Sequence, residues 1–243
     1  MAQEKTKQEI VAQLQKDILL LQGFKPNHGT TQCIGLGPIE AGFPNAVFPI
    51  AAIHEFLCST PEIAASSQGF IAGILQQLMQ NDGTSIYISQ SRSLFPTALF
   101  AYGVQPHQMI FIDVGTERDV LWAMEEALKC KELAAVIAEV RDISFAQSRR
   151  LQLALEKSQV TGFILRTAAD RIATTACVAR WQIKPILSEQ VDGLPGLGFP
   201  RWQVELLRVR NGNPGVWQLE WKAGQFAVVT AAETSDVRRR KTG

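Results

Sequence analysis

The first strand-to-helix turn of the chain is the place where phosphate chemistry would be expected. We assign this turn to residues 58–69, between a short apolar strand and an amphipathic helix. In α/β domains a turn at this position binds phosphate through backbone N–H groups and the N-terminus of the helix. The paired glycines and the Lys-Ser/Thr of a nucleotide-binding loop are missing, and Glu62 adds a negative charge. We therefore predict no nucleotide cofactor.

Basic side chains are scarce throughout this part of the chain. No lysine occurs between Lys25 and Lys129, and the only arginines there are Arg92 and Arg118. Placing the turn elsewhere in this stretch therefore supplies no phosphate-binding lysine. We expect no ATP binding of the phosphate-loop type, and a cryptic ATPase with an unfamiliar pocket is the alternative.

Two carboxylates end predicted strands where a magnesium-binding acid would lie. Glu139 ends one strand, and Asp113 ends the strand before it. Carboxylates bind Mg²⁺ beside substrate phosphates, but acidic residues at strand ends also serve as caps or solvated charges. After the 85–89 strand, where a glutamate would polarise water, the sequence has Gln90. We predict that the chain is not an enzyme and has no catalytic or metal-binding residues.

Histidine and cysteine supply no further candidate. His28, His54 and His107 lie on separate predicted elements, and His54, in the middle of a strand, is typical of a buried imidazole. The four cysteines lie far apart without a Cys-x-x-Cys pair, which argues against a zinc site or a redox pair. This cysteine usage, with no signal-like or membrane-spanning apolar stretch, predicts a cytoplasmic protein with no membrane contact.

A basic run near the end of the chain is a candidate for binding a partner. It consists of Arg238, Arg239, Arg240 and Lys241. Such a run can fold against an acidic protein or the DNA backbone, or it can simply aid solubility.

Three tryptophans of the last predicted strands are a second candidate. An exposed indole would anchor a partner, whereas a buried one would belong to the core. They are Trp202, Trp217 and Trp221.

The loop 166–176 is a candidate for facing DNA. It follows a predicted parallel strand at the end where ligands bind, and it is polar. The residues that could contact DNA are Arg166, Arg171, Thr174 and Thr175, and a plain connection is the other interpretation.

The elements that would position these residues alternate regularly. Apolar strands are predicted at 50–57, 85–89, 108–114, 134–140 and 161–166, and helices at 66–80, 93–102, 116–130 and 144–158. Short apolar strands separated by helices indicate parallel strands buried on both faces. The fold class is therefore α/β, with a mostly parallel twisted sheet flanked by helices.

The carboxy-terminal part changes to strands alone. They are predicted at 177–183, 202–210 and 215–222, and the turn 211–214 joins the last two into an antiparallel hairpin edge. The predicted organisation is an N-terminal amphipathic helix in 1–24, a core domain over 25–230 and a disordered basic tail in 231–243. With 46% hydrophobic residues and a net charge of +1, the chain is typical of a folded protein without a strong overall field for DNA.

Several collinear runs of residues are specific enough to indicate a family: 35–44, 53–56, 118–128, 148–154, 160–166, 179–183, 201–207 and 210–215. Over residues 5–230 they resemble the ImuA family, RecA-like accessory proteins of bacterial damage-induced mutagenesis. The wider resemblance is to the RecA ATPase core, without its phosphate-loop lysine, with Gln90 near the catalytic glutamate position and with a shorter loop at 166–176.

This resemblance implies a non-catalytic accessory protein of translesion synthesis. Its implied partners are ImuB, an inactive-looking Y-family polymerase homologue, and RecA, with an error-prone C-family DNA polymerase engaged indirectly. A cell-division inhibitor similar to SulA, which shares the degenerate RecA ancestry, is the alternative from another class. The oligomeric state and the partner-binding surfaces do not follow from the sequence.

Overall fold

The structure is a computed structural model that describes residues 34–80, 82–91, 93–168, 173–188 and 198–229. The predicted N-terminal helix, its boundary at residue 24 and the basic tail at 231–243 lie outside these residues. The predicted core domain is therefore described from Ile34 onward.

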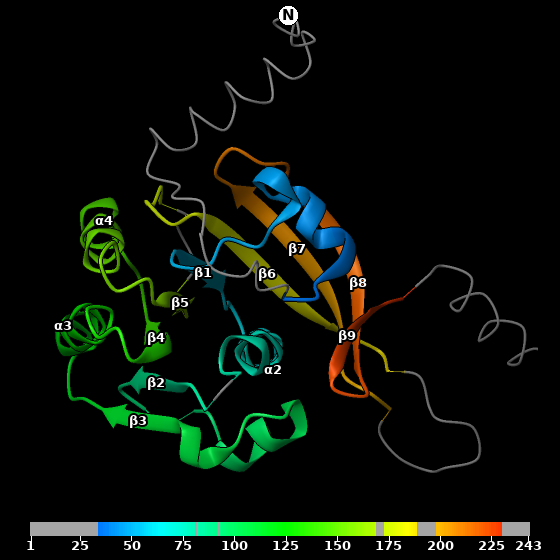
Figure 1. The fold of residues 1–243 in the computed structure, drawn as a ribbon, viewed down its shortest axis with the longest axis horizontal. Coiled ribbons are helices and arrows are strands. Elements are labelled where there is room, and N and C mark those ends of the chain that lie inside the picture. The colour runs from blue at the N-terminus through cyan, green and yellow to red at the C-terminus, as the bar shows by residue number, and fades with distance from the viewer. Residues whose placement is uncertain (1–33, 81, 92, 169–172, 189–197, 230–243) are drawn as a thin grey trace, which may run out of the picture. The chain divides into compact units, whose positions relative to one another are not determined.

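Within the described residues the strands form a single mixed sheet in the order β3-β2-β4-β5-β1-β6-β7-β8-β9 (Figure 1). Neighbouring strands pair in parallel from β3 to β6 and antiparallel from β6 to β9. The strands are β1 (Ile53–Leu57), β2 (Thr84–Ser89), β3 (Met109–Asp113), β4 (Leu133–Val140), β5 (Thr161–Arg166), β6 (Ala179–Ile186), β7 (Arg201–Val209), β8 (Gly215–Lys222) and β9 (Gln225–Val228). The predicted fold class is confirmed, and β9 is a strand that the sequence pattern did not predict.

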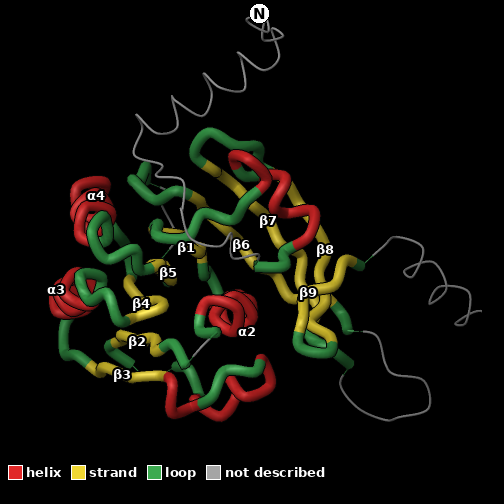
Figure 2. Tube along the Cα trace, in the orientation of Figure 1, coloured by secondary structure: helices red, strands yellow, loops and turns green. Residues whose placement is uncertain are grey.

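Helices cover both faces of the parallel part of the sheet (Figure 2). Helix α2 (Pro61–Leu78) lies on one face, and α3 (Glu117–Ala127) and α4 (Phe145–Ala154) lie on the other. Thr116 caps α3, because its hydroxyl oxygen accepts a hydrogen bond from the backbone N–H of Asp119 at 3.2 Å.

Tighter 3-10 helices complete the connections. The helix predicted over 93–102 is a 3-10 helix that ends at Gly103, whose φ of 82° suits glycine. The pattern prediction of an α-helix there was wrong; the segment buries only Leu99 of its own residues, so it has no apolar stripe to stabilise a longer α-helix by packing. The 3-10 helices are η1 (Gly37–Gly42), η2 (Pro44–Ala46), η3 (Pro96–Tyr102) and η4 (Pro106–Gln108).

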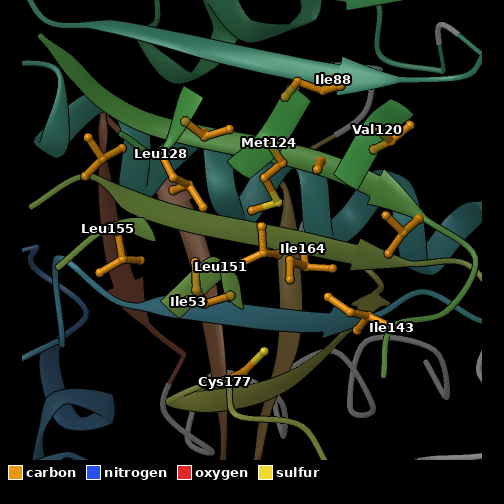
Figure 3. Close-up of a cluster of buried hydrophobic side chains, with 14 residues drawn as sticks. Ile53, Ile88, Val120, Met124, Leu128, Ile143, Leu151, Leu155, Ile164 and Cys177 are labelled. Atoms are coloured by element: carbon orange, nitrogen blue, oxygen red, sulfur yellow. The ribbon is translucent and has the colours of Figure 1, made fainter. Parts of the chain in front are cut away.

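An aliphatic core joins the sheet to α3 and α4 (Figure 3). Val120 and Met124 of α3 and its C-cap residue Leu128 recur at helical spacing, so one stripe of that helix faces the sheet. Leu151 and Leu155 do the same for α4. This packing fixes the two helices side by side on one face.

An aromatic core fills the opposite face, where the sheet curves around α2 (Figure 1). The ring of Trp181 stacks on Phe56 at a centroid distance of 5.9 Å, and Phe70 of α2 packs against both Trp181 and Phe226. Gly73 allows this close approach, because a β-carbon there would lie 2.6 Å from the Phe226 ring. Strands β8 and β9 are thereby held against α2.

Buried His54 makes the stability of this core sensitive to pH. Trp181 Nε1, which can only donate, bonds to His54 Nδ1 at 3.3 Å, so the imidazole carries its proton on Nε2 and donates to the Pro49 carbonyl at 2.7 Å. Burial lowers the pKa of His54 to about 4 from its usual 6.5. Between about pH 6.5 and about pH 4, the unfolded chain therefore binds a proton on His54 that the folded protein does not bind.

We expect the free energy of unfolding to fall by about 2 kcal/mol when the pH is lowered from about 7.5 to about 5, because of His54. Stability falls as the pH drops below 6.5 and the loss levels off near pH 4. Urea unfolding at both pH values checks this, with His54→Gln as the control that lacks the titrating ring. An equal pH dependence in the two proteins would contradict the assignment.

Candidate functional site

The turn between β1 and α2 is only three residues long. Leu57 ends the strand and Pro61 begins the helix, so Cys58, Ser59 and Thr60 make the whole connection. A phosphate loop of the Gly-x-x-x-x-Gly-Lys type needs a longer segment to wrap around a phosphate.

The start of α2 at Pro61 also corrects the predicted helix start at residue 66, which was wrong by five residues. The local signal was present, because threonine, proline and glutamate in a row are typical of a helix N-terminus.

The N-terminus of α2 offers few donors to an anion. The Thr60 hydroxyl oxygen accepts the hydrogen bond of the Ile63 N–H at 3.4 Å, and Pro61 has no N–H to donate. Hydrogen bonding by Thr60 lowers the pKa of Glu62, so this exposed side chain carries a negative charge in the first turn. The electrostatics that draw phosphate to a helix start are opposed here.

Glu139 of β4 is hydrogen-bonded to three side chains from other elements. The hydroxyls of Tyr87 and Ser93 both donate to its carboxylate, and Gln68 of α2 donates to the same oxygen at 3.0 Å. Burial and the Glu139 charge raise the pKa of Tyr87 well above its usual range, so its phenol remains a donor. Glu139, the predicted candidate for a magnesium ligand, therefore accepts hydrogen bonds within the domain. This arrangement favours a structural role for its carboxylate over metal binding.

The space beside this cluster is small. A cavity of about 10 Å³ lies among Gln68, Tyr87 and neighbouring apolar side chains, which is room for about one water molecule. Gln90, at the position expected for a catalytic glutamate, donates instead to the Gly115 carbonyl at 3.2 Å. Burial also raises the pKa of the Cys58 thiol to about 11, so this cysteine is not a reactive thiolate.

The predicted DNA-facing loop contains residues that the structure places in the interior. Arg166 is fully buried, with Nη1 3.0 Å from Glu55 Oε2 and Nη2 bonded to Asp142. The hydroxyl of buried Thr175 donates to the other oxygen of Glu55. The interpretation of Arg166 and Thr175 as DNA contacts is therefore wrong, because both side chains neutralise or solvate a buried carboxylate. Thr174 is exposed and Arg171 lies outside the described residues.

Arg180 of β6 completes this buried ionic cluster. Its Nε lies 2.7 Å from Glu55 Oε1, and its Nη2 donates to the Ala173 carbonyl at 2.6 Å. The cluster therefore connects β1, β5 and β6 and holds the segment before β6. Sequence reasoning missed Glu55, although a lone acid within an otherwise apolar strand is a signal of a buried ion pair.

The three candidate tryptophans do not form an exposed anchor. Trp202 and Trp221 are buried in the aromatic core around α2, and the indole N–H of Trp221 donates to the Ala101 carbonyl at 3.2 Å. Both are therefore excluded as surface anchors. Trp217 is half-buried. The basic run 238–241 lies outside the described residues.

The described residues contain no candidate metal cluster and no candidate membrane span. Among them, histidine, cysteine and acidic side chains form no group of three or more that could hold a metal ion. No helix in the same residues has the length and apolar character needed to cross a membrane.

The strand order, the helices on both faces and the position of the β1–α2 turn define a RecA-like α/β domain. The solved structure of the RadB recombinase matches it with a TM-score of 0.56, covering 82% of this chain and 100% of the RadB chain. The sequence identity is 11%, so this likeness concerns the fold alone.

Sequence comparison then identifies the family. Protein ImuA of Caulobacter vibrioides, from strains NA1000 / CB15N and ATCC 19089 / CIP 103742 / CB 15, is 30% identical over 222 residues, covering 84% of this chain and 91% of the relative. The chain belongs to the ImuA family. No protein-family model matches it.

Proposed function

We propose that this protein is a non-catalytic accessory protein of damage-induced mutagenesis that has lost ATP binding and acts by binding ImuB and RecA. The observation that carries the proposal is the turn between β1 and α2, whose three residues are fewer than a phosphate loop of the Gly-x-x-x-x-Gly-Lys type needs. Membership of the ImuA family supplies the biological setting. Any link to an error-prone C-family polymerase would be indirect.

Four features of the candidate site support the loss of nucleotide binding. The turn lacks the length and the lysine to hold phosphate, and Glu62 repels it. Glu139 is engaged by Tyr87, Ser93 and Gln68, and the neighbouring cavity is water-sized. A domain that keeps the RecA-like scaffold without this chemistry can still present surfaces for docking.

Binding to the proposed partners is tested by titrating the full-length chain against ImuB and RecA from the same genome. We expect saturable binding to at least one, with a dissociation constant on the order of 1 μM, typical of a regulated interface. Failure to bind either protein would refute the proposed function.

Loss of ATP binding is tested separately with a fluorescent ATP analogue and Mg²⁺. We expect no saturable signal up to about 1 mM, the upper end of common substrate constants. RecA from the same genome is the positive control. Saturable binding that unlabelled ATP displaces would favour the cryptic ATPase instead.

A further inference from the structure

A groove runs between α3 and α4, on the face of the sheet opposite α2. The two helices lie side by side and are seen nearly end-on in Figure 1. The groove has a volume of about 370 Å³. Its lining combines the apolar Leu121 and Leu151 and the aromatic Trp122 with polar or charged side chains: Glu117, Arg118, Glu125, Asp142, Gln147 and Arg150.

Most charges in this groove are already engaged within the protein. Glu117 accepts hydrogen bonds from the backbone N–H groups of Arg141 at 2.7 Å and Asp142 at 3.0 Å. Glu125 is paired with Arg150 at 2.6 Å. The Asp142 carboxylate is bonded to buried Arg166. The carboxylates that line the groove therefore serve the domain itself.

Arg118 is different from the other charged residues in the groove. It is exposed, and its guanidinium makes no hydrogen bond or ion pair with any residue that the structure describes. Trp122, one helical turn further along α3, has 64% of its surface exposed. Tryptophan and arginine are the residue types that most often dominate binding energy in protein interfaces. The groove thus presents an unpaired cation and an aromatic ring above an apolar floor.

We propose that this groove docks an acidic, amphipathic segment of a protein partner. Its apolar residues would cover Leu121 and Leu151 and pack on Trp122, while a carboxylate would pair with Arg118. A groove along two adjacent helices suits an extended or helical segment. The inference rests on the proposed function, because the partner to be tested is ImuB.

Charge argues against two other occupants. A second copy of the chain related by a twofold axis would bring the same unpaired Arg118 to the interface from both sides, which is repulsive near the axis. DNA would bring a row of phosphates onto a surface that also carries Glu117, Glu125 and Asp142. An amphipathic segment needs only one carboxylate, at Arg118, so it brings far less negative charge to this surface than a row of phosphates.

The test compares groove variants with matched variants on the other flank of α4. Trp122→Ala and Arg118→Glu change the groove, whereas Phe145→Ala and Arg149→Glu change exposed side chains that do not line it. Affinity for ImuB is measured by titration calorimetry with the full-length chain. We expect each groove variant to bind about 10-fold more weakly or worse, and both control variants to bind like the unmodified protein. Arg118→Lys should retain part of the affinity.

The outcomes separate this inference from the proposed function. If ImuB binds and the groove variants bind as tightly as the controls, the groove inference is overturned while the proposed function stands. If the unmodified protein binds no ImuB, the inference falls, and RecA binding then decides the proposed function. If the groove variants alter the sedimentation of the protein by itself, a second copy occupies the groove and the inference is overturned.

Discussion

Replacing Glu55 by glutamine is expected to lower the free energy of unfolding by about 3–5 kcal/mol. The substitution keeps the shape of the side chain but leaves Arg166 and Arg180 without the carboxylate between them. Both guanidinium groups are buried in the native protein, with their nitrogens 3.0 Å and 2.7 Å from the Glu55 oxygens. Removing one partner of such a cluster leaves uncompensated charge in a medium of low polarity.

Urea unfolding monitored by far-UV circular dichroism measures this effect. The matched control is Arg150→Gln, which breaks the surface ion pair with Glu125, where the Arg150 side chain is 67% exposed. Solvent screens that pair, so the control should change stability by about 1 kcal/mol or less. A Glu55→Gln protein as stable as the control would show that the cluster contributes little.

Replacing Trp181 by alanine is expected to cost about 3–5 kcal/mol. Trp181 is fully buried, and its ring centre lies within 6 Å of Phe43, Phe56 and Phe70. Truncation would open a cavity at the centre of the aromatic core. It would also remove the hydrogen bond from the indole N–H to His54.

The same substitution at Trp122 supplies the control. Trp122 is largely exposed on α3, so Trp122→Ala should change stability by about 0.5 kcal/mol or less. Thermal and urea unfolding of the two variants tests the contrast. Equal losses would contradict the assignment of Trp181 to the core and Trp122 to a surface available for docking. A stable Trp122→Ala protein also makes its binding result interpretable.

The ionic cluster and the aromatic core perform related structural roles on opposite faces of β1. Glu55 points to the α3 and α4 face and binds arginines from β5 and β6, while Phe56 points to the α2 face and stacks on Trp181. Strand β1 is thus held to both of its neighbours by side chains as well as by the backbone. These contacts tie β1, at the centre of the sheet, to both neighbouring strands.

The alternation of strands and helices up to β8, the fold class and the family resemblance followed from the sequence alone, whereas β9 and the 3-10 form of the 93–102 helix did not. These features depend on local properties: apolar runs that form buried strands, helical spacing such as that of Val120 and Met124, and a capping residue such as Thr116. The lack of a lysine near the first turn can likewise be read directly from the residue types in that stretch. Even the early start of α2 was signalled by Thr60 and Pro61.

The tertiary structure alone decided which side chains are available to solvent and which are paired. Arg166 is 111 residues from Glu55 in the sequence, so their contact arises only when β5 lies beside β1. Trp202 and Trp221 become buried because the antiparallel strands curve around α2, whereas Trp122 stays exposed because α3 turns a different stripe to the sheet. The groove exists only because α3 and α4 pack as neighbours. Burial and pairing depend on surfaces that distant segments cover, which is why residue types and spacing did not reveal them.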